Sequence, residues 1–201
     1  TVMLLPNPTR HSRDTRQLRC MWNLREIGLA FIMYADDNKR PFPESTHQPL
    51  EAWRFFQEIH PYFGHQTPKT LLCPADTERP GNTERVVPTS FTNRTYGVPA
   101  TNSFANLIHR NNSLSYFVGL GADPTRPKSI LSGDRNIIGY PASAGPIRLL
   151  GTNADVRWTV TIHRQAGHIL AADGSVDRLR NTHLPQRFAA TGDPTNAVVL
   201  P

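Results

Sequence analysis

The stretch DTRQLRCMWNLREIGLAFIMYADDN, Asp14–Asn38, decides the fold because its apolar residues repeat with the period of an α-helix. One stripe recurs at alternating intervals of four and three residues: Cys20, Leu24, Ile27, Phe31 and Tyr34. A second apolar set widens this surface: Leu18, Trp22, Leu29 and Met33. We therefore expect a long helix that is buried over more than half of its girth.

Residues that favour helix termini mark the two ends of this helix. Asp14 has the side chain of an N-cap residue, and Gln17 follows three positions later, as in a capping box. At the other end, the segment DDNKRPFP, residues 36–43, contains an acidic turn and two prolines that cannot continue a helix. These signals predict a helix over residues 15–36.

The rest of the chain predicts one further helix, then strands and a short terminal helix. A helix is expected at Leu50–Phe63, where Pro61 should end it early. Residues 77–95 are polar and rich in proline, which predicts a loop, and Pro185–Ala190 predicts a short helix. The expected strands are Leu114–Leu120, Ser129–Asp134, Trp158–His163, Gly167–Ala172 and Ser175–Leu179.

Asp173-Gly174 lies between the last two expected strands and indicates a β-hairpin. In a two-residue hairpin loop both positions take the left-handed conformation, which the pair Asp-Gly tolerates. One long helix followed by strands predicts an α+β fold, in which the helix packs on one face of a mainly antiparallel sheet.

Composition limits the class of protein. The chain has 201 residues and 38% hydrophobic side chains, which is enough for one core and indicates a single domain. No run of about eighteen apolar residues is present, so the sequence predicts no transmembrane helix. The net charge is +6, and four arginines recur at every third position: Arg10, Arg13, Arg16 and Arg19. This cluster is either a solvated helix face or a contact surface for anionic headgroups or other phosphates.

The sequence contains none of the common catalytic motifs that we searched for. The nucleophile elbow G-x-S-x-G, the zinc motif H-E-x-x-H and the P-loop are all missing. GLGAD, Gly119–Asp123, lacks the third glycine of the dinucleotide fingerprint. We therefore expect a protein that is not an enzyme and that needs no cofactor.

The stretch HRQAGHILAADGSV, His163–Val176, leaves two interpretations open. His163 and Asp173 can be structural residues of the hairpin. Alternatively, they bind a divalent metal ion with Asp134 as a third donor. Cys20 and Cys73 are too few for a disulfide framework, but they can form one bridge in a protein outside the cytosol.

Three segments resemble a family of bacterial prepilin-like proteins. RCMWNLREIGLAFIMYADDNKRPFP, Arg19–Pro43, resembles the region that follows their membrane helix, and LLCPAD, Leu71–Asp76, resembles their Cys-Pro-x-Asp element. His163, Asp173 and Gly174 fit their C-terminal His-x9-Asp-Gly signature, as in type II secretion pseudopilin-like proteins of planctomycete and verrucomicrobial type. The matching residues are Cys20, Asn23, Leu24, Gly28, Leu29, Ala30, Tyr34, Ala35, Asp37, Phe42 and Pro43, with Cys73, Pro74 and Asp76.

The resemblance covers roughly residues 15–180 and implies a type IV pilin-like fold. It implies a helical stem at residues 15–38 and a head at residues 39–201 in one domain, with residues 1–14 as a remnant or linker after a missing membrane segment. The chain would be a pseudopilin-like subunit of a type II secretion or type IV pilus-like assembly. It would be anchored in the inner membrane with its head in the periplasm, and loops 77–112 and 121–157 would select other pilin-like subunits and secretion components.

The resemblance also implies roles for single residues. Cys20 and Cys73 would form a disulfide that ties the helix to the head. Gly28 would let the sheet approach the helix closely, although a tolerated helix glycine costs only about 1 kcal/mol. The packing side chains would be Leu24, Ile27, Phe31 and Tyr34, and the arginine cluster would lie where the helix leaves the bilayer. The alternative function is a soluble extracytoplasmic protein that binds a ligand or divalent metal on a pilin-like head; nucleic acid is not an expected partner.

Overall fold

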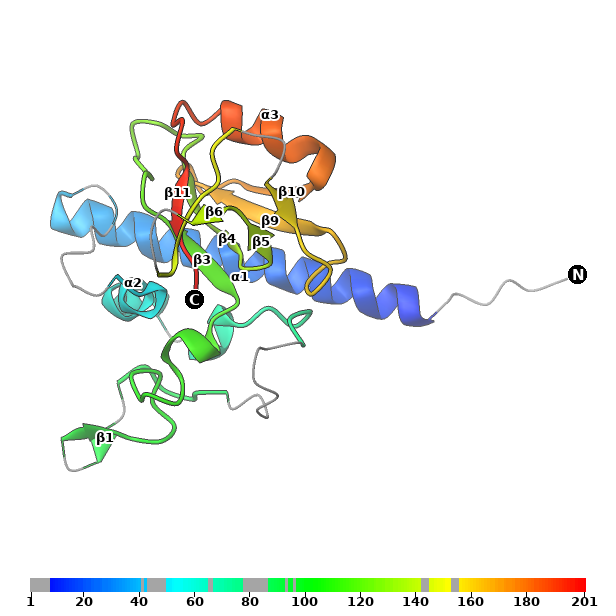
Figure 1. Ribbon diagram of the computed structural model, residues 1–201. Helices are drawn as coiled ribbons and strands as arrows, with labels where there is room; N and C mark the ends of the chain where they lie inside the picture. Colours follow the sequence, from blue (N-terminus) through cyan, green and yellow to red (C-terminus); the bar gives the residue numbers. More distant parts are fainter. Residues whose placement is uncertain are drawn as a thin grey trace, which may run out of the picture.

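The computed structural model shows an α+β fold, in which one long helix crosses one face of an antiparallel sheet (Figure 1). The structure describes residues 8–40, 42, 50–64, 67–77, 87–92, 94–95, 97–141, 145–152 and 156–201, and the side chains of residues 8–13, 95, 140 and 141 lie outside this description. Within the described residues, no helix combines the length and apolar character needed to cross a membrane.

Helix α1, Pro8–Asn38, begins earlier than the sequence predicts. Asp14 lies inside the helix rather than at its N-cap. Proline is favourable in a first helical turn, and neither glycine nor a further proline lies between Pro8 and Asp14. The predicted end is close to the observed one: Lys39 takes a φ of 51°, and the Asn38 side chain donates a hydrogen bond to the carbonyl of Tyr34. A left-handed residue directly after a helix is a common way to end it.

The first apolar stripe of α1 is buried as predicted, but the second is not. Cys20, Leu24, Ile27 and Phe31 are fully buried. The second set is exposed to solvent by 54% at Leu18, 57% at Trp22, 52% at Leu29 and 43% at Met33. At about 100° per residue, the centres of the two stripes lie about 170° apart around the helix. The head covers one side of α1, so the opposite side remains open within this chain.

The main sheet has seven strands in the order β10-β9-β4-β3-β11-β7-β6, and all neighbours are antiparallel. Two small two-stranded sheets accompany it. The strands of the main sheet are β3 Tyr116–Gly119, β4 Ile130–Asp134, β6 Tyr140–Pro141, β7 Ile147–Leu149, β9 Ala166–Ala171, β10 Val176–Arg180 and β11 Ala197–Val199. The small sheets pair β1 Arg94–Thr95 with β2 Val98–Pro99, and β5 Ile137–Ile138 with β8 Arg157–Trp158.

The sheet is buried on both faces because its strands alternate between two cores. Tyr116, Val118, Leu131 and Leu170 belong to the core beneath α1. Their neighbours along the strands belong to a second core that is completed by β8 and by helix α3, Leu184–Ala189: Phe117, Ile130 and Ile169, with Trp158, Leu184 and Phe188. The sequence pattern therefore correctly predicts the packing of α1 on one face, and α3 covers part of the other.

Gly28 lies where α1 approaches the sheet. A Cβ atom at this position would stand 2.9 Å from Cδ1 of Leu170 on β9. The close approach that was expected at Gly28 is confirmed. Beyond it, the Tyr34 hydroxyl donates a hydrogen bond to Glu58, and burial together with Glu58 raises the pKa of Tyr34 to about 12.

The helix predicted at Leu50–Phe63 forms two shorter elements. Helix α2, Ala52–Glu58, ends before Pro61, and the 3-10 helix η1, His60–Phe63, follows. The apolar face is buried as expected. Three further 3-10 helices are η2 Pro68–Leu71, η3 Arg110–Ser113 and η4 Asn181–His183.

Two predictions near the hairpin are wrong in detail. The strand expected at Trp158–His163 ends at Trp158, and residues 159–165 form a turn. The hairpin loop consists of three residues, 172–174, rather than two, because the N–H of Ala171 donates to the carbonyl of Ser175 and the N–H of Gly174 donates to the carbonyl of Ala171. Gly174 alone among the loop residues has a positive φ, of 81°. This loop is a type I turn followed by a left-handed glycine.

Candidate functional site

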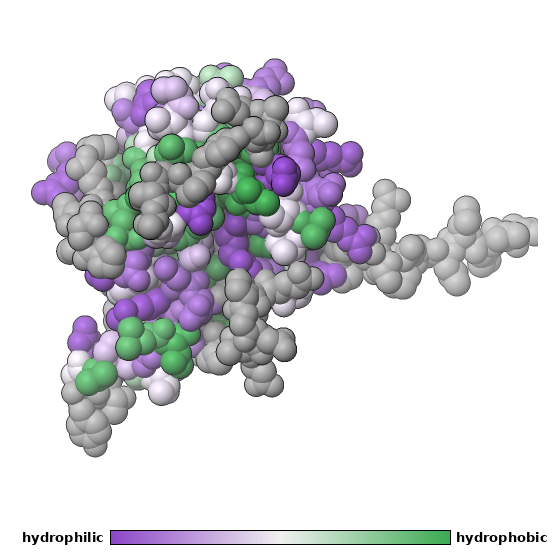
Figure 2. Space-filling model, in the orientation of Figure 1, coloured by the Kyte–Doolittle hydropathy of each residue, from purple (hydrophilic) through white to green (hydrophobic). Residues whose placement is uncertain are grey.

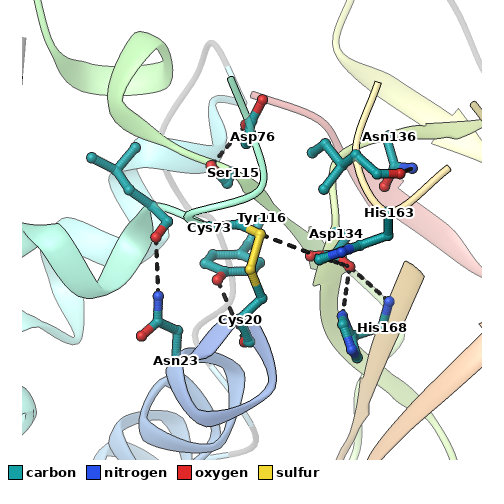
Figure 3. The surroundings of a disulfide bond; sticks show 12 residues. Cys20, Asn23, Cys73, Asp76, Ser115, Tyr116, Asp134, Asn136, His163 and His168 are labelled. Carbon is teal, nitrogen blue, oxygen red and sulfur yellow. Dashed lines mark hydrogen bonds and ion pairs between the residues drawn. A yellow bond between two sulfur atoms is a disulfide. The ribbon is translucent and has the colours of Figure 1, made fainter. Parts of the chain in front are cut away.

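The disulfide bond between Cys20 and Cys73 joins α1 to the segment after η2 and marks the centre of the candidate site (Figure 3). Both cysteines are fully buried, and their Cα atoms are 4.9 Å apart. Two further hydrogen bonds lie beside the bridge: the Asn23 side chain donates to the carbonyl of Leu72, and the Tyr116 hydroxyl donates to the carbonyl of Cys20. The structure thus contains the disulfide that the family resemblance implies.

Asp134, at the end of β4, accepts hydrogen bonds from His168 on β9. Its Oδ2 lies 2.7 Å from the backbone nitrogen and 2.9 Å from Nδ1 of His168, so both nitrogens donate to one carboxylate oxygen. Nε2 of His163 is 3.5 Å from the same oxygen and 3.4 Å from Sγ of Cys73. The two imidazole rings pack edge to face with centroids 4.8 Å apart. The two histidines and the carboxylate therefore form a buried cluster against the disulfide, which we call the His-Asp-His cluster.

His163 is neutral at pH 7 in this environment. Burial lowers its pKa, and the charges of His168 and Arg178 act in the same direction, while Asp134 opposes them. Its Nδ1 is buried and has no hydrogen-bond partner within the described part of the chain, and the same is true of Oδ1 of Asp134. The cluster therefore contains two buried polar atoms, one on His163 and one on Asp134, that are available for a further hydrogen bond or a metal ion.

Asp76, the acidic residue of the Cys-Pro-x-Asp element, has a structural environment. Its buried carboxylate accepts a hydrogen bond from the Ser115 hydroxyl at 2.7 Å and two more from Arg135, from Nε and Nη2, at 2.7 Å each. Because Arg135 directly follows Asp134, this bidentate ion pair fixes the end of β4 on the segment that carries Cys73.

Asn136 holds the 159–165 turn that presents His163. Its side-chain amide donates to the carbonyls of Thr159, Ile162 and Ala166 at 3.2, 2.8 and 3.2 Å. Three consecutive residues of this turn have positive φ angles: His163 at 53°, Arg164 at 52° and Gln165 at 62°. Left-handed conformations are unfavourable for residues with a side chain, so the amide contacts stabilise a strained backbone.

The structure brings together two of the three residues that the sequence predicts as metal ligands. His163 and Asp134 belong to a group of potential ligand atoms, all within 4.8 Å of one another, whose third member is His168. Asp173 instead lies exposed at the hairpin tip, where its Oδ1 accepts a hydrogen bond from the Ser175 N–H, and hydrogen bonds from Ser175 lower its pKa. Sequence reasoning missed His168, although a histidine inside the apolar run AGHILA was a usable signal.

The structure describes the side chains of two of the four arginines in the predicted cluster. Arg16 and Arg19 are exposed, whereas the side chains of Arg10 and Arg13 lie outside the described residues. Arg16 lines a cleft of about 920 Å³ beside the His-Asp-His cluster, and Arg19 lines a different, smaller depression.

A scan against protein-family models, a search of the curated proteins and a search of the solved structures each gave no match.

Proposed function

We propose that this chain is a non-enzymatic, pseudopilin-like subunit of a type II secretion or type IV pilus-like assembly of the cell envelope. The observation that carries the proposal is the exposed stripe Leu18, Trp22, Leu29 and Met33, on the side of α1 that faces away from the head. Large apolar side chains aligned on one exposed helix face favour helix-to-helix packing with a partner. The occupant of this stripe is the α1 helix of a neighbouring copy.

The charges beside the stripe favour parallel packing of two copies. At about 100° per residue, Arg25 lies on one flank of the stripe and Glu26 on the other. In a parallel pair the two flanks of one helix face the opposite flanks of its neighbour, so Arg25 of one copy meets Glu26 of the next. The guanidinium of Arg25 also lies 5.3 Å from the ring centroid of Trp22, which holds both side chains at this surface.

The buried disulfide supports a location outside the cytosol, because such bonds persist in oxidising compartments. We place the head in the periplasm and anchor the chain in the inner membrane, as the resemblance implies. The loop segment 77–112 supplies a partner surface on the head: Val98, Leu107 and Ile108 are exposed. Figure 2 shows a hydrophobic patch over the lobe that carries β1.

Self-association measured by analytical ultracentrifugation tests the proposal. The wild-type chain should associate with rising concentration, and Leu29→Ser should weaken this association about tenfold because one buried leucine is lost. Leu120→Ser is the matched control, since Leu120 is 37% exposed but lies on the head, outside both of the loops proposed as partner surfaces. A wild-type chain that stays monomeric at its highest soluble concentration, or equal effects of the two substitutions, would contradict packing through α1.

A divalent-cation site is a second candidate, favoured by the grouping of Asp134, His163 and His168. One carboxylate oxygen and two imidazole nitrogens from different elements form a donor set that suits Zn²⁺. Zinc should then raise the melting temperature of the wild type and of Asp173→Asn, but not that of His168→Gln. A purified protein without metal, whose melting curve responds neither to zinc nor to a chelator, would exclude this second candidate.

A further inference from the structure

The cleft beside the His-Asp-His cluster is strongly basic. It lies between α1, the 159–165 turn and β10, and four arginines from these elements line it: Arg16, Arg164, Arg178 and Arg180. Asp14 is the one acidic residue in the lining, so the side chains leave a net charge of +3. A concave surface with this charge concentrates anions.

The fold explains why the arginines converge. Side chains alternate along β10, and Val176 packs in the core beneath α1, so Arg178 and Arg180 point to the same side of the sheet. Arg180 pairs with Ala166, the first residue after the turn that carries Arg164. Among the described residues, no carboxylate lies within ion-pair distance of Arg164, Arg178 or Arg180. Three guanidinium groups thus face the cleft without an acidic partner.

Two further observations point to a ligand. The first is the left-handed backbone at Arg164 and Gln165, whose side chains are both exposed and line the cleft. Residues other than glycine in such strained turns cluster at binding sites, where the strain fixes the direction of a side chain. The second is His163, whose backbone lies at the cleft while its side chain is buried directly behind it, with an Nδ1 that has no partner among the described residues. A buried polar atom of this kind is costly unless something binds it.

We propose that this cleft binds a small molecule that carries two or more phosphate groups, either free or presented by anionic phospholipids. Guanidinium forks bind phosphate oxygens through paired hydrogen bonds, and a net charge of +3 needs more than one phosphate for balance. The cleft volume of about 920 Å³ accommodates a molecule larger than a single inorganic anion. No residue of the exposed stripe of α1 lines this cleft, so phosphate binding here does not depend on the assembly function.

Titration calorimetry with tripolyphosphate at low ionic strength tests this site. The wild type should bind tripolyphosphate more tightly than inorganic phosphate, and Arg178→Gln and Arg180→Gln should each weaken binding about tenfold because one charged hydrogen-bond donor is lost. Arg157→Gln is the matched control, since Arg157 is also an exposed strand arginine but does not line the cleft. All three positions are exposed, so the variants should fold like the wild type.

Vesicles of phosphatidylglycerol identify the source of the phosphate groups. If tripolyphosphate releases the chain from vesicles, and Arg178→Gln weakens vesicle binding while Arg157→Gln does not, the cleft takes lipid headgroups. If tripolyphosphate binds and vesicles do not, the ligand is a free molecule. The proposal is overturned if neither probe binds at low salt, or if Arg157→Gln weakens binding as much as Arg178→Gln does, because binding would then reflect net charge alone.

Discussion

His163 combines three roles in one side chain. Its ring lies against the disulfide sulfur, its Nε2 faces Asp134, and its backbone takes the left-handed conformation that starts the turn toward β9. Burial lowers its pKa, so the folded protein holds it neutral at a pH where an exposed imidazole is charged. This single residue therefore links proton binding to the stability of the site.

We expect the free energy of unfolding to rise with pH across the range just below the ordinary histidine value of about 6.5. In this range the unfolded chain binds a proton at His163 and the folded chain does not, so acid favours unfolding. Denaturant titrations at several pH values should show this slope, and His163→Gln should make it shallower. Because the slope is compared, a general loss of stability in the variant does not disturb the test. An unchanged slope in His163→Gln would show that burial of this imidazole does not contribute.

The 159–165 turn is the element that brings His163 and Arg164 to the site. It contains no glycine, and the Asn136 side chain, from the neighbouring strand connection, donates hydrogen bonds to the carbonyls of Thr159 and Ile162 within the turn and to that of Ala166 directly after it. The backbone N–H of Gln165 also donates a hydrogen bond to the carbonyl of Thr159. The conformation is therefore imposed by contacts from outside the turn.

Asn136→Ala should destabilise the protein by about 3 kcal/mol, because it removes three side-chain hydrogen bonds to carbonyl groups that are buried or half-buried. Asn112→Ala is a suitable control, since Asn112 is exposed and forms one long hydrogen bond of 3.5 Å, and it should change stability by less than about 0.5 kcal/mol. Urea titrations of both variants give the comparison. Equal stabilities would mean that the turn does not need Asn136.

Elements with a local signal could be predicted from the sequence. The apolar period of α1, the Asp-Gly hairpin and the terminal helix α3 all depend on residues close together in the chain. The 159–165 turn could not, because His-Arg-Gln carries no residue that favours a positive φ. The exposure of Leu29 could not be predicted either. An apolar stripe indicates that burial is favourable, but it does not show whether the surface that buries it belongs to the same chain.

His168, the potential metal ligand that the sequence did not indicate, was missed for a similar reason. Gly133 pairs with Ile169 across β4 and β9, and this register sets Asp134 beside His168. Sequence spacing does not report a register between strands that are about thirty residues apart, so it does not place His168 beside Asp134. Asp173 was predicted as a ligand because it belongs to a recognisable Asp-Gly motif. The chemistry of the donors was predicted, but their grouping depends on long-range pairing.

At the scale of the whole molecule, the disulfide is the covalent link between α1 and the head. Cys20 and Cys73 are 53 positions apart, and closing a loop of this length stabilises the folded state by about 4 kcal/mol in the chain-entropy description. Protein refolded in the presence of a reductant should therefore melt at a lower temperature than protein refolded without it. An unchanged melting curve, or two thiols that react freely with an alkylating agent in the native protein, would rule the bridge out.

The same bond determines how the molecule would carry a mechanical load. A pull on the exposed N-terminal part of α1, resisted at the sheet, enters at Cys20 and passes through the two sulfur atoms to Cys73. The covalent path through the bridge bypasses residues 21–72 of the chain, which include the second half of α1 and the whole of α2. Beyond Cys73 the force meets the ion pair of Asp76 with Arg135 and the hydrogen bond that the Ser115 hydroxyl donates to Asp76. A pull on the stem is thus delivered through covalent bonds to the start of β3 and the end of β4, in the middle of the sheet.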